Sequence, residues 1–176
     1  MDRQIVKLKL DVNSFDERDF ALIFQTPQLR DVTFTTMREL GDNEKNRRKL
    51  YELNKVCSAD IPGRGEFFIY EEFCKRRYGA HYDPAGAILA QHRADWIGLS
   101  VTSNWSQKGF VFAEMTGVLR EYRRKGVALA MKIHGIRFAK SVGAEFVYAT
   151  HGSDNHKAIG MNRSLGFVDT EWESLA

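Results

Sequence analysis

Residues 118–128 combine a glycine, four cations and the start of a long stretch with helical apolar periodicity. A strand is predicted up to this segment and a helix after it. The first four N–H groups of a helix have no partner within the helix, and the helix dipole places partial positive charge at the same end. The pattern therefore favours the binding of an anion such as a pyrophosphate. The alternative interpretation is a surface loop that caps a helix and carries many cations.

Each residue of this loop has an expected part in anion binding. Gly126 lets the backbone approach the ligand closely, and Ala128 leaves space for it. Arg123, Arg124 and Lys125 place full positive charges at the rim. The remaining expected contacts come from Val118, Leu119, Arg120 and Val127. Neither a G-x-x-x-x-G-K-S/T loop nor a G-x-G-x-x-G loop after a strand is present, so the sequence supports neither a nucleoside triphosphatase nor a dinucleotide enzyme.

With these residues in place, the sequence resembles the GNAT superfamily of acyl-CoA N-acyltransferases. The spacing R-x-x-G-x-A, at Arg123, Gly126 and Ala128, is similar to that family's pyrophosphate-binding motif. A second run, N-x-x-A-x-x-x-N-x-x-L-G-F at 155–167, is similar to its second signature. By element order the resemblance covers residues 33–170. It implies acetyl-CoA as the co-substrate and transfer of its acetyl group to an amine.

The resemblance also implies a geometry for the cofactor. In this family the two central strands that flank the thioester splay apart, so backbone groups near Val118 would pair with the pantetheine arm as a further strand would. An N–H near Leu119 would then polarise the thioester carbonyl, on which charge develops. Asn155 would hydrogen-bond the pantetheine, and Asn162 would lie near the sulfur of coenzyme A.

Glu114 is the first candidate for a catalytic base. Direct attack on a thioester requires a neutral amine, and a glutamate on this strand serves as the base in some family members. Glu114 lies four residues before Val118 on the same predicted strand, so strand alternation places both side chains on one face of the sheet. A general base contributes about 10²–10⁴-fold to the rate. The alternative is an exposed or paired carboxylate without a catalytic part.

Asn162 departs from the family pattern. Many relatives carry a tyrosine at this position to protonate the leaving thiolate, whereas an amide cannot do so at neutral pH. Either another group is the acid, with Tyr148, His151 and His156 as the weaker choices near the cleft, or the thiolate leaves unprotonated. A thiol pKa of about 8.5 makes the second route feasible. We therefore expect Asn162 to act at the catalytic centre by hydrogen bonding alone.

The other segments predict the elements that position these residues. Alternation over 6–12 predicts a strand, and Ser14 with Glu17 forms a capping-box pattern for a short helix. The further elements are a strand at 33–38, helices at 43–58 and 67–78, strands at 87–91, 96–101 and 109–119, a helix at 124–142, a strand at 145–150, a helix at 155–164 and a strand from Gly166. This order predicts an α/β (α+β) fold. The resemblance implies a GNAT-like mixed, mostly antiparallel central sheet with helices on both faces.

The two ends of the chain indicate a rearranged sheet. The family closes with two strands after the position of Phe167, but only 168–176 remain, enough for one. We expect the N-terminal strand to take the place of the missing last strand, within its own chain or in a dimer, so that the chain is a monomer or a homodimer. Residues 1–32 are thus expected to pack, as a strand and a short helix, on a GNAT-like acetyltransferase domain at 33–176. The chain resembles one half of tandem GNAT proteins.

Composition argues against several classes of function. The 176 residues are 43% hydrophobic with a net charge of +3, which fits one soluble domain and gives no support for nucleic acid as a partner. No run approaches the roughly 20 apolar residues that a membrane helix needs, so no membrane partner is expected. Cys57 and Cys74 lack metal-ligand spacing and are interpreted as reduced thiols of a cytoplasmic protein, and no metal is expected.

The acceptor is expected to bind beside the two helices at 43–58 and 67–78 and the loop between them. Carboxylates in this region would suit a cationic amine or, equally, form a solvated helix surface; they are Asp60, Glu66, Glu71 and Glu72. The first interpretation of the chain is an acetyl-CoA-dependent N-acetyltransferase for a small-molecule amine acceptor. The alternatives are a protein acetyltransferase acting on a lysine or an N-terminus, and a non-catalytic acyl-CoA-binding sensor on the same fold.

Overall fold

Seven strands form one mixed sheet in the computed structural model, which describes residues 4–172. Their order across the sheet is β2-β3-β4-β5-β6-β1-β7, and neighbours are antiparallel except for β5 and β6. The strands are β1 (Ile5–Asp11), β2 (Val32–Thr36), β3 (Ala87–His92), β4 (Asp95–Trp105), β5 (Phe110–Val118), β6 (Phe146–Gly152) and β7 (Val168–Asp169). The predicted mixed, mostly antiparallel sheet is confirmed.

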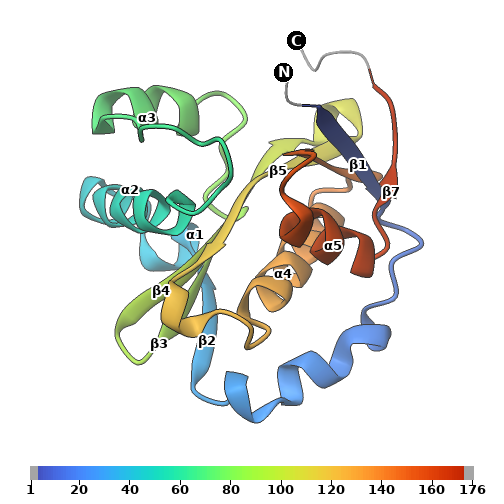
Figure 1. Ribbon diagram of the computed structural model, residues 1–176, viewed down its shortest axis with the longest axis horizontal. Coiled ribbons are helices and arrows are strands. Elements are labelled where there is room, and N and C mark those ends of the chain that lie inside the picture. Colours follow the sequence, from blue (N-terminus) through green and yellow to red (C-terminus); the bar gives the residue numbers. More distant parts are fainter. Residues whose placement is uncertain (1–3, 173–176) are drawn as a thin grey trace.

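Helices cover both faces of this sheet. The α-helices are α1 (Met37–Leu40), α2 (Glu44–Ser58), α3 (Tyr70–Arg77), α4 (Val127–Ser141) and α5 (His156–Ser164). Short 3₁₀ helices are η1 (Glu17–Gln25), η2 (Pro27–Leu29), η3 (Ser106–Lys108) and η4 (Arg120–Tyr122). Figure 1 shows α2 and α3 on one face of the sheet and α4 and α5 on the other. The prediction of helices on both faces is confirmed.

The core consists of apolar layers on the two sides of the sheet. On one side, Leu50 and Leu53 of α2 lie in one buried cluster with Met115 of β5. On the other side, Ile133 of α4 lies in a buried cluster with Val147 of β6. Successive side chains on a strand point to opposite faces. Membership of a β5 residue in one cluster or the other therefore shows on which face of the sheet its side chain lies.

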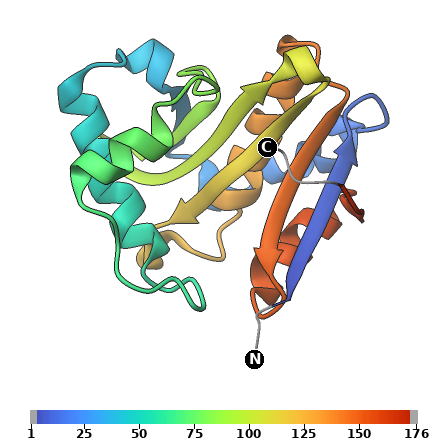
Figure 2. The same ribbon diagram turned by 90° about the horizontal axis from the view of Figure 1, so that it is seen from above.

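β1 lies between β6 and β7, and Figure 2 shows it as the blue strand beside the orange β6. It pairs antiparallel with β6 along all seven of its residues. It also pairs with β7, where Leu8 lies opposite Asp169. The hypothesis that the N-terminal strand lies in the sheet beside residues 166–172 is therefore confirmed within a single chain. The part of the expected last strand at 173–176 lies outside the described residues.

The segment after β1 runs against α4 as the 3₁₀ helix η1. Its cap is Asp16, whose carboxylate accepts the N–H of Arg18 at 3.0 Å. The predicted capping box at Ser14 and Glu17 is wrong, because Asp16 reaches the first free N–H from a position closer to the helix. Glu17 instead forms an ion pair with Arg137 of α4. This pair ties η1 to the helix that follows the glycine-containing turn.

Candidate functional site

A gap separates β6 from the C-terminal part of β5. The two strands pair over only three residues each, Phe110–Phe112 with Phe146–Tyr148. From there to Val118 the edge of β5 that faces β6 has no strand partner among the described residues. The N–H of Leu119 donates to Ile97 O of β4 at 2.8 Å. Because backbone groups alternate in direction along a strand, the N–H and C=O of Val118 point away from β4, toward the gap.

This alternation corrects the expected donor to the thioester. The resemblance implies a free N–H near Leu119, but the bond to Ile97 already occupies the N–H of that residue. The N–H directed toward the gap is that of Val118. Sequence alone could not decide between the two, because the register of β4 against β5 shifts between Val101 and Thr102.

The turn before α4 has a backbone conformation that favours glycine. Gly126 is the N-cap of α4 with φ of +85°, and Arg124 also has a positive φ, 59°. α4 therefore begins at Val127 rather than at 124, because left-handed residues cannot belong to a right-handed helix. A Cβ at Gly126 would lie 3.8 Å from Ile23 and 3.9 Å from Leu29, which are ordinary contact distances. The positive φ of Gly126 therefore favours glycine here, whereas the neighbouring side chains would tolerate a Cβ.

The N-terminus of α4 brings N–H groups and cations together. The first helical hydrogen bond runs from the N–H of Ala130 to Gly126 O at 3.0 Å, so the earlier N–H groups of the helix have no acceptor within it. Arg124 and Lys125 are exposed beside these groups, and Ala128 adds only a methyl group to this end of the helix. The arrangement suits a diphosphate.

Arg120 and Arg123 are held by Asp60, in the loop between α2 and α3. Nη2 of Arg120 lies 2.9 Å from Oδ1 of Asp60, and Nη1 of Arg123 lies 2.7 Å from Oδ2. The hydrogen bonds from Arg123 and then Arg120 hold the pKa of Asp60 below its usual value. Nε of Arg123 also donates to Val118 O at 2.9 Å. The cations of the loop thus divide: Arg120 and Arg123 fix the turn, whereas Arg124 and Lys125 are exposed.

The two asparagines of the second signature have different environments. Asn155 caps α5, and its Oδ1 accepts the N–H of Ala158 at 3.4 Å, which leaves its Nδ2 for a ligand. Asn162 is fully buried, and its Nδ2 lies 2.6 Å from Nε2 of His151 on β6. Oδ1 of Asn162 is buried with no hydrogen-bond partner among the described residues. Burial, with a contribution from Lys132, lowers the pKa of His151 to about 4, so the imidazole is neutral near pH 7.

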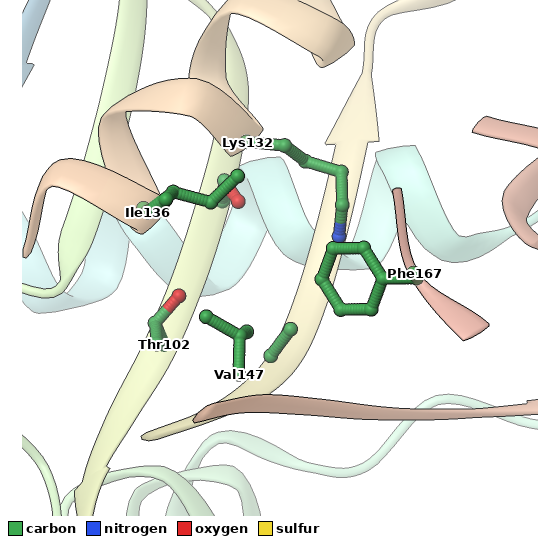
Figure 3. A pocket seen from close by; sticks show the side chains of 8 residues that line it. Thr102, Lys132, Ile136, Val147 and Phe167 are labelled. Carbon is green, nitrogen blue, oxygen red and sulfur yellow. The ribbon is translucent and has the colours of Figure 1, made fainter. Parts of the chain in front are cut away.

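Lys132 is a buried cation that the sequence reasoning missed. It is 7% exposed, and its Nζ lies 5.5 Å from the ring centre of Phe167 (Figure 3). Together with Ala113 of β5 and Val147 of β6 it lines a cavity of about 10 Å³, enough for one water molecule. No carboxylate lines this cavity, and burial lowers the pKa of Lys132 to about 8. The sequence signal for its burial was its position in the predicted helix between the apolar residues Met131 and Ile133.

Glu114 occupies a β-bulge in β5. The register against β4 shifts so that Met115 and Ala113 face consecutive residues of β4, which leaves Glu114 as the extra residue. Glu114 and Met115 therefore both lie on the α2 side of the sheet, while Val118 packs in a cluster with α4. The prediction that Glu114 and Val118 share one face is wrong, because the bulge reverses the alternation between them.

A cavity of about 140 Å³ opens beside Glu114 on the α2 side of the sheet. The carboxylate accepts a hydrogen bond from Oγ of Ser103 at 2.7 Å, and Nε1 of Trp105 donates to the same Oγ at 3.0 Å. Other walls come from the end of α3 and the segment after it, including Arg77 and Tyr82. The candidate base therefore lines a cavity on the α2 side of the sheet.

The acidic residues expected at the acceptor site do not line this cavity. Asp60 is bound by two arginines of the turn before α4. Glu72 pairs with Arg76 at 2.9 Å, and Glu66 and Glu71 are exposed. Of the two interpretations that the sequence left open for these carboxylates, the solvated and ion-paired surface is the one that the structure bears out.

Three further observations concern residues 4–172. Within this range no group of three or more His, Cys, Asp or Glu side chains is arranged to hold a metal ion. No helix in the same range has the length and apolar character needed to cross a membrane. Cys57 and Cys74 are free thiols, the first buried and the second half-buried.

Comparison with known sequences connects this geometry to one family. Residues 47–167 match the family model described as the Acetyltransferase (GNAT) family. A mycothiol acetyltransferase of Thermobispora bispora is 29% identical over 127 residues, which cover 68% of this chain and 41% of the relative. The chain spans about two fifths of the length of the curated relatives it matches.

Solved structures share the fold. A GCN5-related N-acetyltransferase from Sphaerobacter thermophilus has a TM-score of 0.67 at 17% identity, covering 96% of this chain and 49% of that chain. AAC(6')-Iy, solved with the bisubstrate analogue CoA-S-monomethyl-acetylneamine, has a TM-score of 0.59 at 18% identity, covering 82% of this chain and 96% of that chain. At such identities the likeness concerns the fold alone. Since the family model matches more than half of the residues, the chain belongs to the GNAT family of acetyltransferases.

Proposed function

We propose that this chain transfers the acetyl group of acetyl-CoA directly to the amine of a small molecule. The observation that carries the proposal is the open edge of β5, where the backbone groups of Val118 face the gap toward β6. An extended pantetheine arm can pair with such an edge as an added strand does. The free N–H groups of α4, which follow the same strand end, then bind the diphosphate.

The N–H of Val118 is the donor we assign to the thioester carbonyl. During attack, negative charge develops on the carbonyl oxygen, and a donor fixed on a strand stabilises it without reorganisation. Nδ2 of Asn155, free of the helix cap, is assigned to the pantetheine arm. These assignments use groups that the fold leaves without protein partners.

Glu114 is the group we assign to accept the proton of the attacking amine. Its carboxylate is oriented by Ser103 and lies at the cavity that would hold the acceptor. As the new C–N bond forms, the proton passes from nitrogen to the carboxylate and the C–S bond breaks. Base catalysis contributes about 10²–10⁴-fold, and holding amine and thioester together contributes up to ~7–11 kcal/mol.

The leaving thiolate receives no proton from Asn162 in this account. His151, one of the alternative acids, is neutral near pH 7 and bonded to Asn162. The ammonium of Lys132 lies between α4 and the two splayed strands, and a cation there favours the thiolate over the thiol. A thiol pKa of about 8.5 already makes the thiolate an adequate leaving group.

The size of the acceptor cavity supports a small-molecule acceptor. A volume of about 140 Å³ beside Glu114 accommodates a small amine. Relatives named mycothiol acetyltransferase agree with a small-molecule acceptor.

The proposal is tested by measuring CoA thiol release from acetyl-CoA with a panel of small primary amines. We expect amine-dependent release with at least one of them, together with the acetylated product by mass spectrometry. Parallel reactions contain peptides with a free N-terminus or a lysine. Turnover restricted to peptides would assign a protein acetyltransferase. Acetyl-CoA binding without turnover in either panel would contradict a transferase and indicate an acyl-CoA sensor.

A further inference from the structure

Arg77 is a half-buried cation beside the candidate base, and it forms no ion pair within residues 4–172. It is the last residue of α3 and lines the cavity that Glu114 also lines. Its Nε is buried and has no hydrogen-bond partner among the described residues. Its guanidinium carbon lies 5.6 Å from the ring centre of Phe73, an apolar neighbour. Because a buried polar group needs a hydrogen-bond partner, this position indicates a group that the protein itself does not supply.

Neighbouring arginines have the carboxylate partners that Arg77 lacks. Arg76 pairs with Glu72 at 2.9 Å, and Arg47 pairs with Asp42 at 2.8 Å. No ion pair within residues 4–172 includes Arg77. The contrast indicates that the partner of Arg77 comes from outside the chain.

Glu114 forms no ion pair with Arg77 within residues 4–172, although both line the same cavity and the charge of Glu114 partly opposes the lowering of the Arg77 pKa by burial. The carboxylate of Glu114 accepts a hydrogen bond from Oγ of Ser103, and the same Oγ accepts one from Nε1 of Trp105. These two hydrogen bonds fix the orientation of the carboxylate. The cavity therefore presents a guanidinium on one wall and a carboxylate on another. A ligand with the opposite arrangement of charges, an amine and an anion in one small molecule, would satisfy both walls.

We infer that the acceptor is an amino carboxylate, such as an α-amino acid, whose carboxylate binds Arg77 while its amine faces Glu114. Arginine offers five N–H donors in a planar fork that matches a carboxylate, and such charge-assisted pairs are strong. The positive charge of Arg77 disfavours acceptors that carry a second amine in place of the carboxylate. This inference rests on the proposed function and narrows it to a substrate class.

Matched acceptors test the inference directly. For several side chains, an L-amino acid, its amide and the corresponding decarboxylated amine are compared by kcat/KM at saturating acetyl-CoA. We expect the carboxylate-bearing member to exceed the other two by about 10²-fold, the size of effect that loss of a buried charge pair produces. A panel of diamines is expected to be poorer than the matched monoamines.

Variants at Arg77 identify the group responsible. Arg77→Met is expected to remove the preference for the carboxylate while leaving acetyl-CoA affinity unchanged, and Arg77→Lys to restore part of it. Thermal unfolding of Arg77→Met should be unchanged or higher, because the substitution removes a buried Nε that has no hydrogen-bond partner within residues 4–172. Arg48→Met is the matched control, since Arg48 pairs with Glu44 and is 62% exposed on α2; it should keep the preference.

The outcomes separate this inference from the proposed function. If amines are acetylated without preference for a carboxylate, or if Arg77→Met keeps the preference, the inference is wrong and the transferase assignment stands. If no amine is acetylated at all, the transferase assignment is wrong. In that case titration calorimetry of amino acids into the CoA-bound protein still decides: binding that Arg77→Met abolishes supports the carboxylate site, and absence of binding overturns it.

Discussion

Nε of Arg123 lies 2.9 Å from the carbonyl oxygen of Val118, and Nη1 of the same side chain lies 2.7 Å from Oδ2 of Asp60. One guanidinium thereby joins the open edge of β5, the turn before α4 and the loop between α2 and α3. The strand edge assigned to the pantetheine and the turn assigned to the diphosphate are held in register by this residue.

Arg123→Met is expected to weaken acetyl-CoA binding about tenfold, because hydrogen bonds to charged groups contribute roughly 1.5–3 kcal/mol and the peptide of Val118 loses its fixed direction. The measurement is titration calorimetry with acetyl-CoA. Arg120→Met is the control, since Arg120 contacts Asp60 but not the backbone of Val118. Equal losses of acetyl-CoA affinity in the two variants would show that affinity depends on the positive charge alone and not on the hydrogen bond to Val118.

Glu114→Gln is expected to lower kcat by about 10²–10⁴-fold with little change in acetyl-CoA affinity, because the amide cannot accept the proton of the amine. Ser103→Ala should cause a smaller loss, since it removes only the hydrogen bond that orients the carboxylate. The exposed Glu71 of α3 provides the control Glu71→Gln, which should behave as wild type. A kcat of Glu114→Gln equal to that of the wild type would contradict the assignment of Glu114 as the catalytic base.

Gly126→Val is expected to abolish acetyl-CoA binding, because φ of +85° at the N-cap of α4 is unfavourable for a β-branched residue. Gly143, at the other end of the helix, has φ of +72° and open space around its Cβ position. Gly143→Val should therefore lose stability by a similar amount, roughly 1–2 kcal/mol, while still binding acetyl-CoA. Retention of binding by Gly126→Val, measured by calorimetry, would contradict the diphosphate site.

Lys132→Met is expected to raise the free energy of unfolding near pH 7 by up to roughly 3 kcal/mol, because burial lowers the pKa of Lys132 from 10.5 to about 8. Between these two values the unfolded state holds a proton that the folded state has lost, so wild-type stability rises with pH. The gain in Lys132→Met should accordingly shrink between pH 8 and pH 10.5. Denaturant unfolding at pH 7 and at pH 9.5 checks this, and a gain independent of pH would show that Lys132 is not buried as a charge.

The fold was predictable because the residue patterns that mark its strands and helix ends are local in the sequence. Gly126 marks the start of α4, because few residue types other than glycine adopt a positive φ. Asn155 marks the start of α5, because its side chain can cap a helix. Alternation of apolar and charged residues over 6–12 predicted β1 as a strand. Its place between β6 and β7 is an interior position of the sheet, where both of its edges are paired.

The chemistry at the two sides of β5 was less predictable, because it depends on partners far apart in sequence. A bulge changes which face Glu114 takes, and alternation in the sequence carries no mark of it. Asp60 was expected at the acceptor site, but its two arginine partners lie some sixty residues later in the chain. Arg77 and Lys132 are typical surface residues by type, and only tertiary packing buries Lys132 and the Nε of Arg77.

Residue-resolved amide hydrogen exchange, with and without acetyl-CoA, tests the central claim most directly. The account predicts that the N–H of Val118 becomes protected when acetyl-CoA binds, because it then pairs at the open edge of β5. The N–H of Leu119, already bonded to Ile97, should show no comparable gain. Saturating acetyl-CoA that leaves the exchange of Val118 unchanged would contradict the placement of the cofactor along β5.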